Sequence, residues 1–140
     1  MDEPLLSGIN HVTLAATNID ITIAFYEDVF RLESTDFSVP GEARSALLVF
    51  PNGSFVQVCS AATIPATTAP LSATPGNLLH DGAPLDHFSL FATGVDALEV
   101  IRARLMERGA TDGEIIDTAG VAKTVRFADP DGRLLEVTAY

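Results

Sequence analysis

The feature that most constrains the fold of this chain is an internal repeat. Residues 9–14 (INHVTL) correspond to residues 85–90 (LDHFSL), so each copy carries a histidine at the same point of an alternating apolar pattern. The correspondence continues, since residues 17–20 (TNID) align with residues 93–96 (TGVD). Both copies then enter a stretch with the apolar spacing of a helix.

A second pair of segments repeats in the same order. Residues 51–58 (PNGSFVQV) correspond to residues 130–137 (PDGRLLEV) at nearly the same offset. Two matched blocks in one order are hard to produce by chance in a chain of this length, so we infer a duplicated unit. We predict one domain over residues 1–140, with the units at 8–59 and 85–140. Residues 60–84, rich in Ala, Thr and Pro, form a linker or lid.

Each unit has the pattern of a strand, a helix and then strands that end in a hairpin. The first helix is predicted to begin at Asn18, a good N-cap, and the second to span Val95 to Arg108 before Gly109. Three- and four-residue spacing predicts which helical residues face inward: Ile19, Ile23, Tyr26 and Phe30, then Leu98, Ile101 and Leu105. Asn52-Gly53 and Asp131-Gly132 supply the positive φ that tight hairpin turns need. The sequence therefore predicts two tandem βαβββ modules of the α+β class.

Polar residues recur on one face of the predicted strands. Because side chains alternate between faces, His11 shares a face with Thr13, and Glu136 shares one with Thr138. The duplication pairs His11 with His87 and Gln57 with Glu136. Such polar groups at otherwise apolar strand centres are costly to bury without a common partner.

We therefore predict that His11, Gln57, His87 and Glu136 converge on a divalent metal. Imidazole and carboxylate with an amide oxygen suit Fe, Mn, Co, Ni or Zn better than Ca. Four protein donors would leave open positions on a six-coordinate ion. Arg44 and Arg126 are interpreted as surface cations, the default for arginine, although either one would suit an anionic substrate.

The motifs Asn10-His11-Val12 and Asp86-His87-Phe88, together with the closing run Phe127 to Glu136 (FADPDGRLLE), carry a family resemblance. With them the chain resembles the glyoxalase, bleomycin-resistance and extradiol-dioxygenase superfamily, also called the vicinal oxygen chelate superfamily, over nearly its whole length. That resemblance implies a glyoxalase-like half-barrel domain and a dimer. The order His, Gln, His, Glu is most similar to methylmalonyl-CoA epimerase.

The resemblance also implies a chemistry, in which two oxygens of a small-molecule substrate chelate the metal and an enolate or oxyanion is stabilised. A carboxylate then moves the proton, as in an isomerase, epimerase or lyase. Glu136 and the loop residue Glu42 are the candidates for this general acid/base work.

Two alternatives remain open at this point. His11, His87 and Glu136 without Gln57 form a two-His-one-carboxylate set suited to Fe(II), as in an extradiol-type dioxygenase, with His80 as a candidate acid/base. A protein that only binds an apolar or aromatic compound, as antibiotic-resistance proteins of this superfamily do, would use the polar strand face to orient its ligand.

Composition and charge disfavour some classes of binding partner. The formal net charge of −11 disfavours nucleic acid, whose binding depends on Lys and Arg neutralising phosphates. No apolar run approaches the length of a transmembrane helix, so no membrane partner is expected. The single Cys59 and the acidic start of the chain favour a cytoplasmic location.

Overall fold

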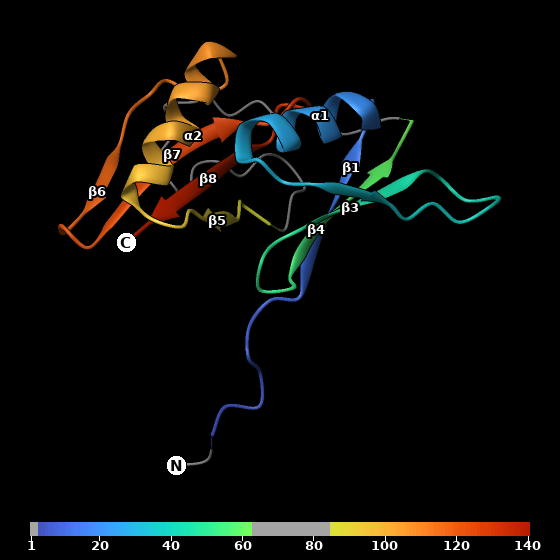
Figure 1. Cartoon of the computed structure of the whole chain (residues 1–140), viewed down its shortest axis with the longest axis horizontal. Helices are drawn as coiled ribbons and strands as arrows, with labels where there is room; N and C mark the ends of the chain where they lie inside the picture. The colour runs from blue at the N-terminus through green and yellow to red at the C-terminus, as the bar shows by residue number, and fades with distance from the viewer. Residues whose placement is uncertain (1–2, 63–84) are drawn as a thin grey trace. The chain divides into compact units, whose positions relative to one another are not determined.

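A computed structural model describes residues 3–62 and 85–140, and it contains two βαβββ modules (Figure 1). The chain divides into two compact units, residues 1–64 and 65–140, with one module in each. Each module has one four-stranded sheet and one helix. The predicted α+β class and the tandem duplication are therefore confirmed.

The first module is built from an edge strand, a helix and a three-stranded meander. Its elements are β1 (His11–Ala16), α1 (Ile19–Phe30), β2 (Ser34–Asp36), β3 (Ser45–Val49) and β4 (Phe55–Ser60). The strand order is β1-β4-β3-β2. β1 runs parallel to β4, whereas the other neighbours are antiparallel. β4 ends one residue inside the predicted linker range.

The second module repeats this topology. Its elements are β5 (Ser89–Phe91), α2 (Val95–Glu107), β6 (Ile116–Thr118), β7 (Ala122–Ala128) and β8 (Leu134–Ala139). The strand order β5-β8-β7-β6 is equivalent to that of the first sheet, and β5 is again parallel to its neighbour. The two modules therefore share their connectivity as well as their motifs.

The strand registers of the two sheets also agree. Thr13 lies opposite Gln57 in the first sheet, and the equivalent Ser89 lies opposite Glu136 in the second. One difference from the prediction concerns His87, which precedes β5 instead of lying within it. β5 keeps only three residues because its ladder with β8 spans three pairs, although the Glu136 N–H still donates to the Phe88 carbonyl (3.2 Å).

Helix α1 begins where the sequence predicts. The Asn18 side chain accepts a hydrogen bond from the Ile21 N–H, which satisfies one of the free donors of the first turn. Ile19 and Tyr26 are buried as predicted, whereas Ile23 and Phe30 are only half-buried. The other buried positions of the helix are Thr22, Phe25 and Val29. Apolar residues surround much of this helix, so three- and four-residue spacing is compatible with more than one inward face. Packing against β3 and β4 decides which face is buried.

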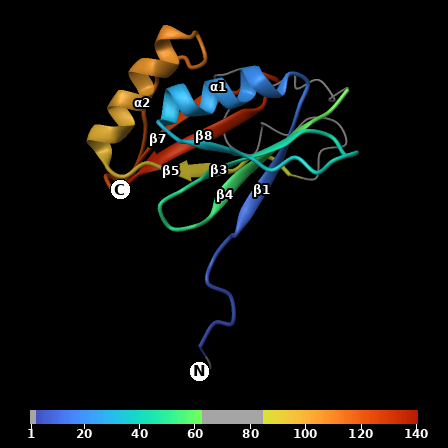
Figure 2. The ribbon, with the colours of Figure 1, turned by 45° about the vertical axis from the view of Figure 1, so that its right-hand side comes forward.

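Helix α2 buries a narrower stripe. Figure 2 shows α2 lying beside β7 and β8. Leu98 and Leu105 are fully buried, whereas Ile101 is half-buried. Arg108 caps the helix, and Gly109 follows at φ +64°, as predicted for the stop. Neither helix in the described part of the chain is long and apolar enough to cross a bilayer.

The hairpin turns form at the predicted glycines. Gly53 at φ +88° donates its N–H to the Phe50 carbonyl, and Gly132 at φ +81° donates to the Asp129 carbonyl. Alternate strand residues are then buried beneath each helix, such as Val56 and Val137. The opposite face of each sheet carries the polar residues that sequence analysis selected.

Candidate functional site

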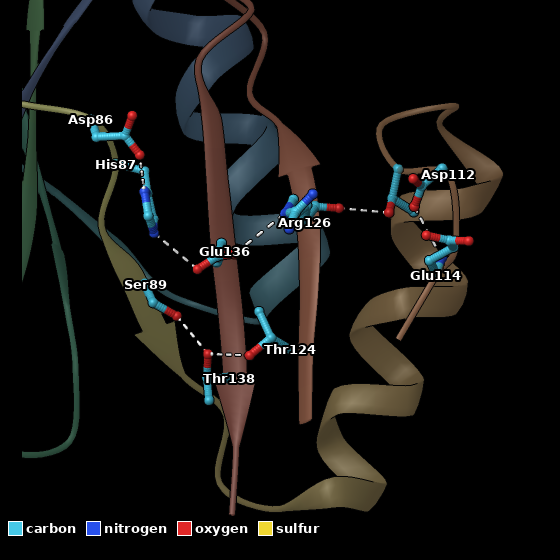
Figure 3. Close-up of polar contacts among 10 residues, drawn as sticks. Asp86, His87, Ser89, Asp112, Glu114, Thr124, Arg126, Glu136 and Thr138 are labelled. Carbon is cyan, nitrogen blue, oxygen red and sulfur yellow. Dashed lines mark hydrogen bonds and ion pairs between the residues drawn. The ribbon is translucent and has the colours of Figure 1, made fainter. Parts of the chain in front are cut away.

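In the second module, two of the predicted metal ligands lie next to each other. His87 Nε2 is 3.0 Å from Glu136 Oε1, which joins the segment before β5 to the centre of β8 (Figure 3). The Glu136 side chain is only 9% exposed, and that of His87 is 21% exposed. A carboxylate so far removed from water needs a cationic or hydrogen-bonding partner.

The orientation of His87 is set by its neighbour in sequence. Asp86 Oδ2 lies 2.5 Å from His87 Nδ1. This contact holds Nδ1 against the Asp86 carboxylate and leaves Nε2 facing the carboxylate of Glu136. Metal-bound histidines are held in the same way, by a carboxylate or carbonyl on the second ring nitrogen.

Arg126 on β7 is the second partner of Glu136, and here the prediction of a surface cation is wrong. Arg126 is 8% exposed, and its Nε lies 3.4 Å from Glu136 Oε2. The two residues are direct partners in the β7–β8 ladder, so strand pairing places the guanidinium on the face of the carboxylate. The contact could not be predicted from the spacing along one strand, because it depends on the register of the β7–β8 hairpin.

A chain of hydroxyl groups continues along the same face of the second sheet. Ser89 Oγ lies 2.7 Å from Thr138 Oγ1, which lies 2.9 Å from Thr124 Oγ1 (Figure 3). These residues are two positions along their strands from the His87, Glu136 and Arg126 cluster. The face therefore presents charged and hydroxyl groups in two successive rows.

The first module holds His11 in a similar way. Asn10 Oδ1 lies 2.7 Å from His11 Nδ1, as Asp86 does for His87. The His11 ring also stacks on Phe55 of β4, with centroids 4.6 Å apart and planes 2° from parallel. Each predicted histidine ligand thus follows an Asn or Asp whose side chain contacts Nδ1, so that Nε2 points away from this neighbour.

Gln57 occupies the position of Glu136 but has neutral partners. Its Nε2 donates to Ser45 Oγ (2.8 Å), and its Oε1 lies 3.4 Å from Thr13 Oγ1. Cys59 Sγ is 3.6 Å from the same Ser45 oxygen, so the thiol lies on the polar face. At 3.4 Å the hydrogen bond from Thr13 is weak. The Gln57 amide oxygen can therefore accept a further partner.

The donors present are compatible with a divalent metal. Each module supplies one imidazole with its second nitrogen occupied and one oxygen donor, which together make a mixed N/O set typical of first-row metals. Among residues 3–62 and 85–140, no group of three or more His, Cys, Asp or Glu side chains is placed to hold a metal. The four-donor site therefore stays a prediction.

The other predicted residues lie elsewhere. Glu42 is exposed in the loop between β2 and β3, where its N–H donates to the Val39 carbonyl. Arg44 is exposed and bonds Asp20 at 2.9 Å; this hydrogen bond, helped by the charge of Arg44, lowers the pKa of Asp20. His80, and residues 63–84 of the predicted linker or lid, fall outside the described residues.

Comparison with known proteins gives a family and a set of related folds. Residues 8–137 match the model of the Glyoxalase/Bleomycin resistance protein/Dioxygenase superfamily. A glyoxylase/bleomycin resistance protein/dioxygenase domain from Frankia sp. EAN1pec has 21% identity and a TM-score of 0.72, covering 96% of this chain and 92% of that one. No curated protein matches the chain.

Two further solved structures share the fold. An integron cassette protein from the Halifax Harbour sewage outfall metagenome has 19% identity and a TM-score of 0.68, covering 96% of this chain and 100% of that one. The fosfomycin resistance protein FosX of Listeria monocytogenes, solved as a mutant complexed with Mn(II) and 1S,2S-dihydroxypropylphosphonic acid, has 16% identity and a TM-score of 0.68. That match covers 97% of this chain and 94% of FosX.

Proposed function

Because this chain belongs to the glyoxalase/bleomycin resistance protein/dioxygenase superfamily, we propose that it is a divalent-metal-dependent enzyme acting on a small molecule. The proposed reaction is an isomerisation, an epimerisation or an elimination beside a chelated oxygen. The contact that carries the proposal is His87 Nε2 to Glu136 Oε1 at 3.0 Å, with the imidazole oriented by Asp86.

His11, Gln57, His87 and Glu136 would hold the ion, and Fe, Mn, Co, Ni or Zn would suit this donor set. A bound metal would act as a Lewis acid that polarises two substrate oxygens and stabilises an enolate or oxyanion. The presence of Mn(II) in the FosX structure supports such chemistry on this fold. Within this set, the His, Gln, His, Glu order favours an epimerase similar to methylmalonyl-CoA epimerase.

Proton transfer is assigned to carboxylates of this chain. Glu136 is the first candidate, because it is nearly buried and its two oxygens face different partners, His87 and Arg126. Glu42 is the second, on an exposed loop where a proton can exchange with water. A base must come within hydrogen-bond reach of the proton that it removes, so the reaction itself decides between them.

The first test is metal content. Metal-free protein would be loaded with each ion, under anaerobic conditions for Fe(II), and analysed by mass spectrometry. We expect one tightly bound ion per chain in the wild type and loss of that ion in Glu136→Gln. Glu99→Gln is the matched control, since Glu99 is an exposed helix residue paired with Arg102. A wild-type protein that binds no stoichiometric ion would contradict the proposal.

The second test is proton exchange. Loaded protein would be incubated in D₂O with a panel of acyl thioesters and hydroxyketones, and deuterium incorporation beside the carbonyl followed by NMR. We expect incorporation with the wild type and its loss, by about a hundredfold or more, in Glu136→Gln. Exchange at the buffer rate throughout the panel would remove the isomerase and epimerase assignments.

A second candidate function is binding without catalysis, and the Arg126–Glu136 ion pair favours it. The guanidinium already neutralises the carboxylate, so Glu136 is charge-balanced without an ion. In such a sequestering protein, ligand affinity would be unaffected by chelators and by His11→Ala. Calorimetry of ligand binding with and without chelator separates the two functions.

A further inference from the structure

Arg126 is a buried cation whose hydrogen-bonding capacity is largely unused. Its side chain is only 10% exposed, yet within residues 3–62 and 85–140 its one guanidinium hydrogen bond runs from Nε to Glu136 Oε2. A guanidinium carries five N–H donors, and the four on its two terminal nitrogens are not hydrogen-bonded within these ranges. Neither terminal nitrogen is a fully buried atom without a partner. Both can therefore donate to an acceptor that reaches this face of the sheet.

The ion pair with Glu136 is also longer than usual and is made through a single nitrogen. Arginine and carboxylate normally form two parallel hydrogen bonds of roughly 2.7–2.9 Å. Here a single contact of 3.4 Å, made from Nε, leaves the terminal nitrogens out of the pair. Arg133 shows the contrast, since its terminal Nη1 binds Asp129 Oδ2 at 2.7 Å in the turn of the same hairpin.

The neighbouring hydroxyls offer a further donor on the same face. Ser89, Thr138 and Thr124 are linked by two hydrogen bonds, which use two of their three hydroxyl protons. One O–H group therefore remains to donate outward. Thr124 lies two residues before Arg126 on β7, so both side chains project from the same face of the sheet.

From this geometry we propose that Arg126 receives an oxyanionic group of the substrate, a carboxylate or a phosphonate, through its terminal nitrogens. The proposal deepens the proposed function and rests on it, because it names the substrate class of the same site. An anion at Arg126 would also offset the repulsion between the guanidinium and any divalent ion held by Glu136. Arg126 then fixes which end of the substrate faces His87 and Glu136.

The direct experiment observes the guanidinium in metal-free wild-type protein. Acetate and methylphosphonate would be titrated separately at constant ionic strength, with the Arg126 Nε–Hε signal followed by ¹H–¹⁵N NMR. We expect saturable shifts of this signal and of the Thr124 and Thr138 amides with at least one probe. Sodium chloride at equal ionic strength should produce none.

The second experiment measures probe binding by variants of Arg126. Arg126→Gln removes the positive charge and the parallel N–H donors of the guanidinium. We expect it to weaken probe binding about tenfold or more. Arg126→Lys keeps the positive charge but loses the parallel N–H donors, so it should bind the probes with intermediate affinity. It also serves if the Gln variant does not fold. Arg44→Gln is the matched control, because Arg44 is an exposed arginine paired with Asp20, and it should bind as the wild type does.

Two results would overturn this proposal. One is wild-type protein whose Arg126 signal does not move with either probe, and the other is unchanged probe affinity in both Arg126 variants. Because these titrations use no metal, they succeed or fail independently of the metal-content test. A protein without a metal site can still bind the anion, and a metal-dependent enzyme can fail to bind it.

Discussion

At the scale of single residues, the candidate ligands depend on neighbours that are adjacent in sequence. Asn10 and Asp86 each occupy the Nδ1 nitrogen of the following histidine, so both rings present Nε2. This arrangement needs no tertiary contact, because the two side chains come from consecutive residues. The Asx-His pair is thus the part of the site that the repeat preserves most fully.

Removing the acceptor from one pair should weaken metal binding. We expect Asp86→Ala to lower metal affinity by about 10- to 100-fold, because His87 loses the partner that fixes its tautomer. Asp86→Asn keeps an acceptor oxygen and reproduces the Asn10 arrangement, so it should lose far less. Competition with a fluorescent chelator measures both, and equal losses in the two variants would contradict the orienting role.

At the scale of elements, local signals predicted most of the boundaries. The Asn18 cap, the Gly109 stop and the two glycine turns all form where the sequence places them. The buried face of α1 was predicted less well, because the apolar spacing of this helix is compatible with more than one face. His87 was predicted to lie on a strand but precedes β5, because the length of β5 depends on how far β8 pairs with it.

The cap of α1 gives a test at this scale. We expect Asn18→Ala to lower the free energy of unfolding by about 1 kcal/mol, because the Ile21 N–H loses its acceptor. Asn18→Ser, which restores a capping oxygen, should recover most of this loss. Equilibrium urea unfolding measures the difference, and an alanine variant as stable as the wild type would show that the cap contributes nothing.

At the scale of the whole molecule, duplication explains why the donors come in pairs. Each module holds one histidine oriented by the preceding Asn or Asp, and the residue opposite Thr13 or Ser89 is the proposed oxygen donor. Gln57 and Glu136 have diverged, so the two halves would contribute different charge to one ion. The proposed four-donor centre would draw its ligands from both modules.

The number of ions bound per chain shows whether the two modules share one metal ion. If one ion is shared, His11→Ala and His87→Ala should each abolish the same tight binding event seen by calorimetry. Separate sites would instead leave one event intact in each variant. Sedimentation of mixed His11→Ala and His87→Ala chains, followed by metal analysis, would show whether a dimer restores the site.

The sequence by itself determined the duplication, the fold class, the turns, the helix starts and the polar strand faces, because each follows from periodicity or from the backbone preferences of a few adjacent residues. Tertiary structure decided that Arg126 is buried on Glu136 and that His87 precedes its strand. The first depends on the register of the β7–β8 hairpin, and the second on how far β5 pairs with β8, a strand distant from it in sequence.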